Sequence, residues 1–134
     1  MAEHGRAREQ NLTGVWNGLY TYQDGRSTSF VATLIDAGGA ITGTTHEPGT
    51  GGGETLYAGL NGSRSGSAVS FTKTYDRPDT LHRSVILYEG ALNGDNTEIE
   101  GRWTIVQVWS GKFLMIRSAG QEAEASREVL ARVR

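Results

Sequence analysis

The feature of this sequence that most constrains its fold is a two-residue alternation of side chains, interrupted at short intervals by turn residues. Within residues 12–23, Trp16 and Tyr20 would share one face of an extended strand, and Val15 and Leu19 the other. The same alternation recurs along the chain between Gly, Asn and Asp residues, which favour tight turns. Strands are therefore expected at residues 12–23, 28–36, 40–47, 55–63, 67–75, 83–92, 98–109 and 112–117.

Eight strands with mostly short connections predict an all-β fold, an eight-stranded antiparallel up-and-down β-barrel. A closed sheet has no exposed edges, and eight strands leave an interior that side chains fill or that holds one small ligand. We expect the barrel domain to span residues 12–117, after a polar N-terminal segment at 1–11. Residues 118–134 follow as a tail, in which the Ala, Glu and Arg of 121–134 predict a short helix that packs on the barrel or on a neighbouring subunit, or frays.

Composition argues against several classes of function. The chain has no Cys, which excludes a disulfide framework, a thiol nucleophile and a zinc–thiolate site. Its 13 Lys and Arg against 15 Asp and Glu argue against a nucleic-acid partner. No apolar run approaches the roughly 18–20 residues of a membrane-spanning helix, and residues 1–10 lack the apolar stretch of a signal peptide. We expect a cytoplasmic protein with no membrane partner, no cofactor and no metal site.

Three stretches resemble a known family. Gly14-Val15-Trp16 is similar to the Gly-x-Trp opening of lipocalins and avidins, in which the Trp plugs one end of a barrel. Residues 41–45 resemble the third strand of avidin and streptavidin, and residues 88–103 resemble the family's aromatic-x-Gly, strand, turn, strand, Trp pattern. The resemblance implies a streptavidin-like barrel that forms a homo-oligomer, a dimer or a tetramer.

The residues that bind biotin in that family are replaced here. Gly18 stands where avidins carry a polar residue, Thr45 and Glu47 stand where streptavidin has a Tyr and a Ser, and Lys73 stands where a Trp stacks on biotin. The resemblance therefore implies a barrel with a differently lined interior that does not bind biotin. It also implies a subunit contact at Trp103, with plain core packing as the alternative.

The segment Phe71-x-Lys73-x-Tyr75 places a lysine among aromatic residues on one strand face. An ionised lysine inside a barrel costs several kcal/mol unless it is paired, and Glu47 is the nearest plausible partner. Three arrangements are open: an exposed pair on the outer face, a buried structural pair, or a pair that lines a ligand site. In the third, the ligand-binding residues would be Tyr20, Tyr22, Glu47, Lys73, Tyr75 and Tyr88.

The leading functional hypothesis is a non-catalytic barrel that binds a small polar or anionic ligand in its mouth. Tyrosine hydroxyls would supply fixed hydrogen bonds, aromatic rings contact area, and Lys73 the charge. The alternative is a structural or oligomerisation module whose barrel is filled by its own side chains. An enzyme is the third hypothesis, and it lacks a recognisable nucleophile and base in the sequence.

Overall fold

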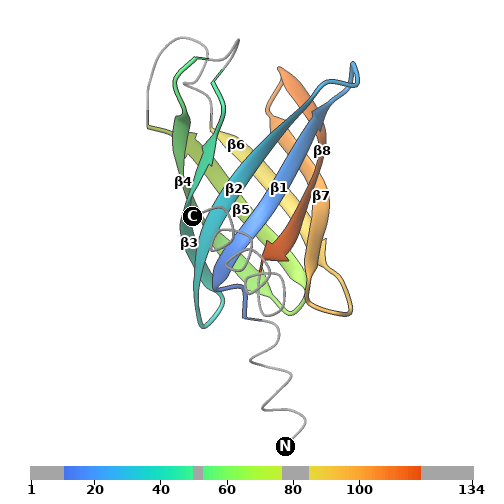
Figure 1. The fold of residues 1–134 in the computed structure, drawn as a ribbon. Coiled ribbons are helices and arrows are strands. Elements are labelled where there is room, and N and C mark those ends of the chain that lie inside the picture. Colours follow the sequence, from blue (N-terminus) through green and yellow to red (C-terminus); the bar gives the residue numbers. More distant parts are fainter. Residues whose placement is uncertain (1–10, 50–52, 77–84, 119–134) are drawn as a thin grey trace, which may run out of the picture.

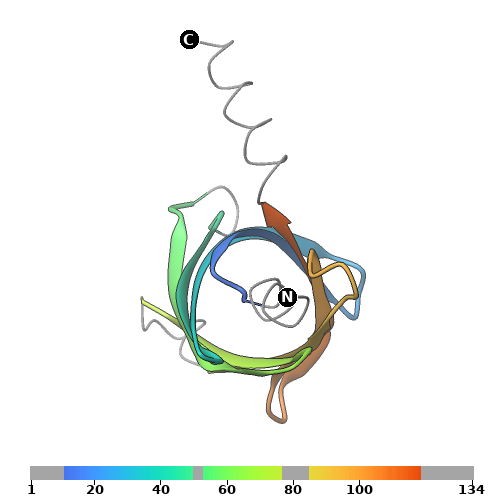
Figure 2. The same ribbon diagram turned by 90° about the horizontal axis from the view of Figure 1, so that it is seen from below.

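A computed structural model describes residues 11–49, 53–76 and 85–118. The described chain is a closed barrel in which each strand pairs antiparallel with the next and β1 pairs with β8 (Figures 1 and 2). This confirms the predicted all-β up-and-down architecture. The helix expected at 121–134 and the N-terminal segment at 1–10 lie outside the described residues. The strands are β1 (Gly14–Tyr22), β2 (Ser27–Ala37), β3 (Ala40–Glu47), β4 (Leu56–Ser65), β5 (Ala68–Tyr75), β6 (Ile86–Leu92), β7 (Glu98–Ile105) and β8 (Trp109–Ser118).

The inward face of each strand follows the predicted two-residue period. On β1, Trp16 and Tyr20 are buried, while Val15 and Leu19 are each 41% exposed on the outer face. Gly18 lies between the two buried aromatic residues and opposite Phe30 of β2. A side chain at Gly18 would overlap the Phe30 ring. This glycine therefore leaves space for the Phe30 ring to lie over β1 inside the barrel.

The turn between β7 and β8 corrects the predicted seventh strand. The alternation of residues 98–109 predicts one unbroken strand, but β7 ends at Ile105 and β8 begins at Trp109. Gln107 adopts a left-handed φ of 61°, and the amide of Val108 donates a 3.0 Å hydrogen bond to the carbonyl of Ile105. Trp103 and Trp109 therefore lie on neighbouring strands, contrary to the expectation of one shared strand.

Side chains close the end of the barrel that carries the β2–β3 turn. Trp16 and Leu12 are fully buried there, and the Trp16 indole N–H donates a 2.9 Å hydrogen bond to the Leu12 carbonyl. This confirms the predicted role of Trp16 as a plug. The guanidinium of Arg117 lies 4.6 Å from the centre of the Trp16 ring, and Asp36 pairs with Arg64 at 2.7 Å.

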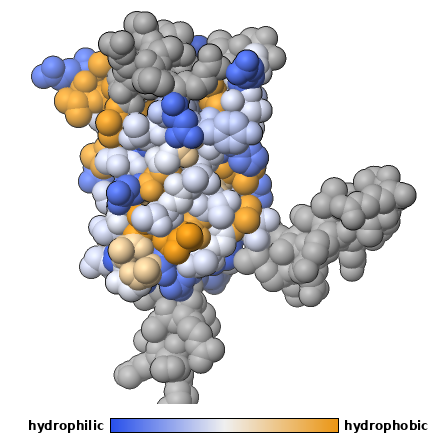
Figure 3. Space-filling model, turned by 90° about the vertical axis from the view of Figure 1, so that its left-hand side faces the viewer, coloured by the Kyte–Doolittle hydropathy of each residue, from blue (hydrophilic) through white to orange (hydrophobic). Residues whose placement is uncertain are grey.

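Polar and apolar residues are interspersed on the face of the barrel shown in Figure 3. This mixed surface is typical of the solvent-facing side of an antiparallel sheet. In the part of the chain that the structure describes, no helix is long and apolar enough to cross a membrane.

Candidate functional site

A buried cluster of ionisable groups lies inside the barrel around the carboxylate of Glu47. Lys73 donates a 2.6 Å hydrogen bond to Glu47 Oε1, and Tyr75 donates one of 3.0 Å to the same oxygen. Tyr20 donates a 2.5 Å hydrogen bond to Oε2. The side chains of Glu47 and Lys73 are 3% and 1% exposed. The outer-face arrangement considered from the sequence is therefore wrong, because the pair is inside the barrel.

Strand register explains how these residues meet. Glu47 ends β3, while Lys73 and Tyr75 lie two residues apart on β5 and so share its inward face. Tyr20 comes from β1, on the other side of β3 in the strand order. One carboxylate thus links three strands that are not neighbours, through hydrogen bonds across the barrel interior.

Aromatic rings surround the ammonium group of Lys73. Its Nζ lies 4.9 Å from the ring centre of Tyr20 and 4.8 Å from that of Tyr75. The rings of Phe30 and Tyr88 follow at 5.2 and 5.8 Å. Cation–π attraction and the Glu47 ion pair together replace the water that burial removes from this lysine.

Burial shifts the protonation of the cluster. Desolvation lowers the pKa of Lys73, although the adjacent Glu47 carboxylate opposes that shift. Desolvation also raises the pKa values of Tyr20, Tyr75 and Tyr88 well above the ordinary tyrosine value, and the negative charge of Glu47 adds to the effect. The three tyrosines are therefore neutral hydroxyl groups at physiological pH.

Above this cluster, the barrel holds a cavity of about 740 Å³. Its base is formed by Glu47 together with Tyr20, Tyr75 and Tyr88, and its walls are mostly aromatic and aliphatic. The volume falls within the range of roughly 300–1,000 Å³ that is typical of small-molecule sites. The wall residues are Tyr22, Leu56, Ile86, Trp103, Ile105 and Trp109, with Arg26, Ser27, Thr28, Ser29, Pro48 and Gly49 nearer the rim.

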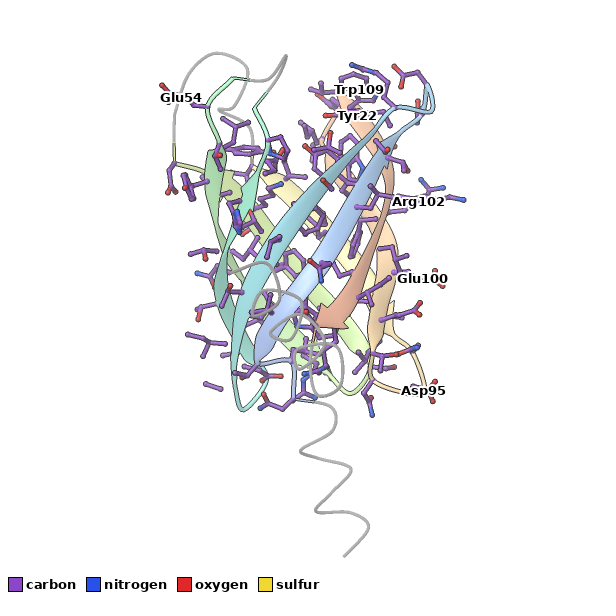
Figure 4. All side chains as sticks on the ribbon, in the orientation of Figure 1. Tyr22, Glu54, Asp95, Glu100, Arg102 and Trp109 are labelled. Carbon is purple, nitrogen blue, oxygen red and sulfur yellow. The ribbon has the colours of Figure 1, made fainter. Side chains whose placement is uncertain are left out.

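The cavity opens at the barrel end that carries the β1–β2 and β7–β8 turns, where Tyr22 and Trp109 lie together (Figure 4). Their ring centres are 4.7 Å apart. The guanidinium of Arg26 lies 4.7 Å from the Tyr22 ring centre and 5.5 Å from that of Trp109. An exposed ion pair of 2.8 Å joins Arg26 to Asp24. The mouth of the cavity is therefore an aromatic surface covered by one positive charge.

Five of the six residues that we predicted for the ligand site line this cavity: Tyr20, Tyr22, Glu47, Tyr75 and Tyr88. Lys73 does not line it. The lysine lies beneath Glu47, 1% exposed, and its charge is directed to that carboxylate. The geometry thus brings all six residues together but separates Lys73 from any contact with the cavity contents.

Among the lining residues that were not predicted for the site from the sequence are Arg26, Trp103 and Trp109. Trp103 is 2% exposed and its indole N–H donates a 3.0 Å hydrogen bond to the Thr21 carbonyl, so the core-packing alternative accounts for its position within a single chain. Arg26 directly follows a predicted hairpin turn, and its carbonyl accepts a 2.8 Å hydrogen bond from the Tyr22 amide, so the β1–β2 hairpin places it at the rim. The pairing of β1 with β8 brings Trp109 beside it, and this contact could not be predicted from a local motif.

His46, the sequence neighbour of Glu47, lies apart from the cavity. His46 is exposed on the outer face and stacks on Tyr57, with ring centres 6.2 Å apart, while its neighbour Glu47 points inward. Across residues 11–49, 53–76 and 85–118, no three His, Cys, Asp or Glu side chains gather into a group that could hold a metal.

The comparisons with known proteins identify the fold alone. No known protein family and no curated protein sequence matches this chain. A redesigned β-barrel, b11L5F_LGL, is similar in structure with a TM-score of 0.69, at 14% identity, covering 85% of this chain and 96% of that one. A de novo designed fluorescence-activating β-barrel has a TM-score of 0.60 at 14% identity, covering 81% of this chain and 95% of that one. The chain thus shares an eight-stranded barrel with these designs, and no link to avidin or streptavidin emerges.

Proposed function

We propose that this protein is a non-catalytic binding protein that holds one small molecule in the open end of its barrel. The observation that carries the proposal is the cavity of about 740 Å³, whose aromatic walls surround a few fixed polar groups at the base. A predominantly apolar pocket with few convergent hydrogen-bonding groups is the usual form of a small-molecule site. The alternative of a barrel filled entirely by its own side chains is disfavoured by the same cavity.

Two further points support the proposal. One of the similar structures is a designed β-barrel described as fluorescence-activating, so a barrel of this architecture is compatible with a function beyond packing its own core. The side chains around Glu47 are also held by hydrogen bonds to its carboxylate, so the base of the cavity is preorganised.

The proposal includes the setting of the protein. We propose a cytoplasmic location, because the chain has no Cys. We also expect a homo-oligomer, because the paired strands β1 and β8 expose the apolar side chains of Val15, Leu19 and Ile116. Light scattering coupled to size-exclusion chromatography measures the oligomeric state, and a monomer at all concentrations would contradict this part.

A pair of matched variants tests ligand binding directly. Thr28 faces the cavity from β2 and is half-buried, whereas Thr33 is exposed on the outer face of the same strand. Thr28→Trp should obstruct the open end of the cavity with an indole ring and abolish the fluorescence gain of anilinonaphthalene sulfonate, a dye that brightens in apolar sites. Thr33→Trp should leave that gain unchanged.

Native mass spectrometry of the full chain, purified gently, complements the dye. Extra mass that denaturation releases from the original chain, and that Thr28→Trp does not carry, would give the mass of a natural ligand. Dye binding that is equal in both variants and in the unaltered chain would reject the cavity as a binding site.

A further inference from the structure

We propose, on the basis of the binding function above, that the cavity selects a flat aromatic molecule with a neutral hydroxyl at its inner end and an anionic group at its outer end. The inner end would meet Glu47 and Tyr88, and the outer end would meet Arg26. This assignment moves the cation that attracts the ligand from Lys73, where the sequence placed it, to the rim.

The base of the cavity disfavours a charged group. Lys73 and Glu47 neutralise one another at 2.6 Å, and the lysine is covered by the carboxylate and by aromatic rings. An anion at the base would therefore face the Glu47 carboxylate and not the ammonium group. A cation would compete with Lys73 for a carboxylate that is already paired, and it would lose its own hydration.

The base nevertheless has one donor and one acceptor to offer. Tyr88 lines the cavity and is 2% exposed, and its hydroxyl has no hydrogen-bond partner among the described residues. Glu47 accepts three hydrogen bonds, while a carboxylate has about four acceptor positions. A ligand hydroxyl can accept from Tyr88 and donate to Glu47, which satisfies both groups at once. A ligand without a hydroxyl at this point would cover Tyr88 and Glu47 without replacing the hydrogen bonds that they can make to water in the cavity, so this pairing is a source of selectivity.

The walls favour a flat ring system. Trp103 lies edge-on to both Tyr20 and Tyr22, with ring centres 6.1 and 5.4 Å apart. Ile86 and Ile105 add aliphatic surface. Offset and edge-to-face contacts with such rings stabilise an aromatic guest beyond the area that it buries.

The rim supplies the positive charge. Arg26 uses Nε to pair with Asp24, and its two terminal nitrogens have no hydrogen-bond partner among the described residues. Its guanidinium is held over Tyr22 and Trp109, directly at the mouth. A planar guanidinium with available N–H groups is well suited to a carboxylate or another oxyanion.

The rise along β1 from the level of the cavity base to the level of Arg26 is a guide to the length of the ligand. The backbone of Arg26 pairs with Tyr22, which is two residues along β1 from Tyr20. Two strand residues correspond to about 7 Å. Two fused aromatic rings that carry substituents at opposite ends span a comparable distance.

Isothermal titration with a set of naphthalene compounds tests the proposal. Hydroxynaphthoate, with its two groups at opposite ends, should bind at least about tenfold more tightly than naphthol or naphthoate, which each lack one group. Naphthylmethylammonium should bind more weakly than naphthol. The tightest binding by this ammonium compound would overturn the assignment, because it would make Glu47 a cation site.

Variants separate the two ends. Tyr88→Phe should weaken naphthol and hydroxynaphthoate severalfold and leave naphthoate unchanged, while Arg26→Gln should weaken both carboxylates and leave naphthol unchanged. Tyr57→Phe and Arg102→Gln are matched controls on the outer face, where both side chains are exposed (Figure 4 for Arg102), and neither should alter any affinity. Unchanged thermal unfolding would establish that each variant is folded.

The outcomes distinguish this inference from the function on which it rests. If all the compounds bind with equal affinity and Thr28→Trp blocks them all, the binding function stands and the inferred ligand class is wrong. If not even naphthol binds and no natural ligand is found by mass, the proposed function fails and the inference fails with it.

Discussion

At the scale of single residues, Glu47 is the group on which most of the interior depends. A carboxylate and an ammonium removed from water each lose several kcal/mol of hydration, and only good geometry restores it. Here the ion pair at 2.6 Å, two tyrosine hydroxyls and a ring of aromatic faces provide that geometry. We therefore expect the pair to contribute to the uniqueness of the interior more than to its net stability.

This interpretation predicts an asymmetry between single and double substitutions. Lys73→Met leaves the Glu47 charge buried without its partner, and we expect a loss of about 3–5 kcal/mol in the free energy of unfolding. Glu47→Leu together with Lys73→Met replaces the pair by apolar groups and should recover most of that loss. Urea denaturation of the three proteins measures both values. A single variant within about 1 kcal/mol of the original chain would contradict a compact buried pair.

The tyrosines predict a distinct response to alkali. The pKa values of Tyr20, Tyr75 and Tyr88 are raised by burial first and by neighbouring groups, Glu47 among them, second, so these phenols stay protonated in the folded protein above the ordinary value of about 10. The unfolded chain loses these protons at about pH 10, so stability falls as pH rises beyond that value.

Spectrophotometric titration checks the prediction through the ultraviolet absorbance of phenolate. Substituting any of the three by Phe should leave the absorbance change of the folded protein intact and reduce only the change that accompanies unfolding. A variant that loses signal before unfolding would show that its phenol is accessible to ionisation in the folded barrel.

The same residues show what sequence reasoning can and cannot reach. The two-residue period on β5 is sufficient to predict that Lys73 and Tyr75 share a face. It cannot decide whether that face is inside, because one irregularity reverses every later side chain. Nor can it show that Glu47 covers Lys73, since that depends on side chains reaching across the barrel from strands that are not neighbours.

At the scale of elements, the turns carry the main departure from expectation. Glycine, Asn and Asp mark most turns correctly, and β3 has the bounds that the alternation predicts. The β7–β8 turn escapes prediction because Val106, Gln107 and Val108 look like strand residues. Val106 and Val108 are 73% and 70% exposed in this turn. Their β-branched, hydrophobic side chains are typical of buried strand positions and so give no indication of an exposed turn.

That turn yields a prediction at the same scale. Gln107 has a φ of 61°, a conformation that is unfavourable for a side chain with a Cβ, so Gln107→Gly should stabilise the barrel by about 0.5–1 kcal/mol. Asn96 has a φ of 62° in the β6–β7 turn, and Asn tolerates this region well. Asn96→Gly is therefore the matched control and should change stability little. Thermal unfolding compares the two variants, and an equal or opposite effect at both sites would contradict the argument from backbone strain.

At the scale of the whole molecule, the two ends of the barrel differ in how fully their side chains fill the interior. One end is closed by Leu12 and Trp16 over a network of hydrogen bonds, and the other holds the cavity. The division fits a general rule that rigid packing positions a site while the site itself departs from full packing. Side chains at the closed end should therefore contribute most to stability, and substitutions there should lower the free energy of unfolding of the whole barrel.

Asp36 is the residue that tests this division. Its carboxylate is fully buried and accepts hydrogen bonds from Arg64, from the Leu12 amide and from the Gly39 amide, at 2.7, 3.0 and 2.8 Å. Burial alone would raise the pKa of this carboxyl, but the three donors outweigh it and hold the pKa below the ordinary value. The folded state thus retains the carboxylate at a pH where the unfolded chain takes up a proton, so the stabilisation is present above about pH 4 and is lost as pH falls further.

Asp36→Asn should therefore lower the free energy of unfolding at neutral pH by about 1.5–3 kcal/mol and make its decline below about pH 4 shallower than in the original chain. Asp24→Asn is the matched control, because its exposed ion pair with Arg26 contributes little to stability. Urea denaturation at a series of pH values measures both effects.

Because the ring contacts and hydrogen bonds of the cavity lie at the opposite end, Asp36→Asn should also retain the dye affinity of the folded protein. If dye affinity fell as steeply as stability, the two ends would be one cooperative site, and the assignment of separate structural and binding ends would be wrong.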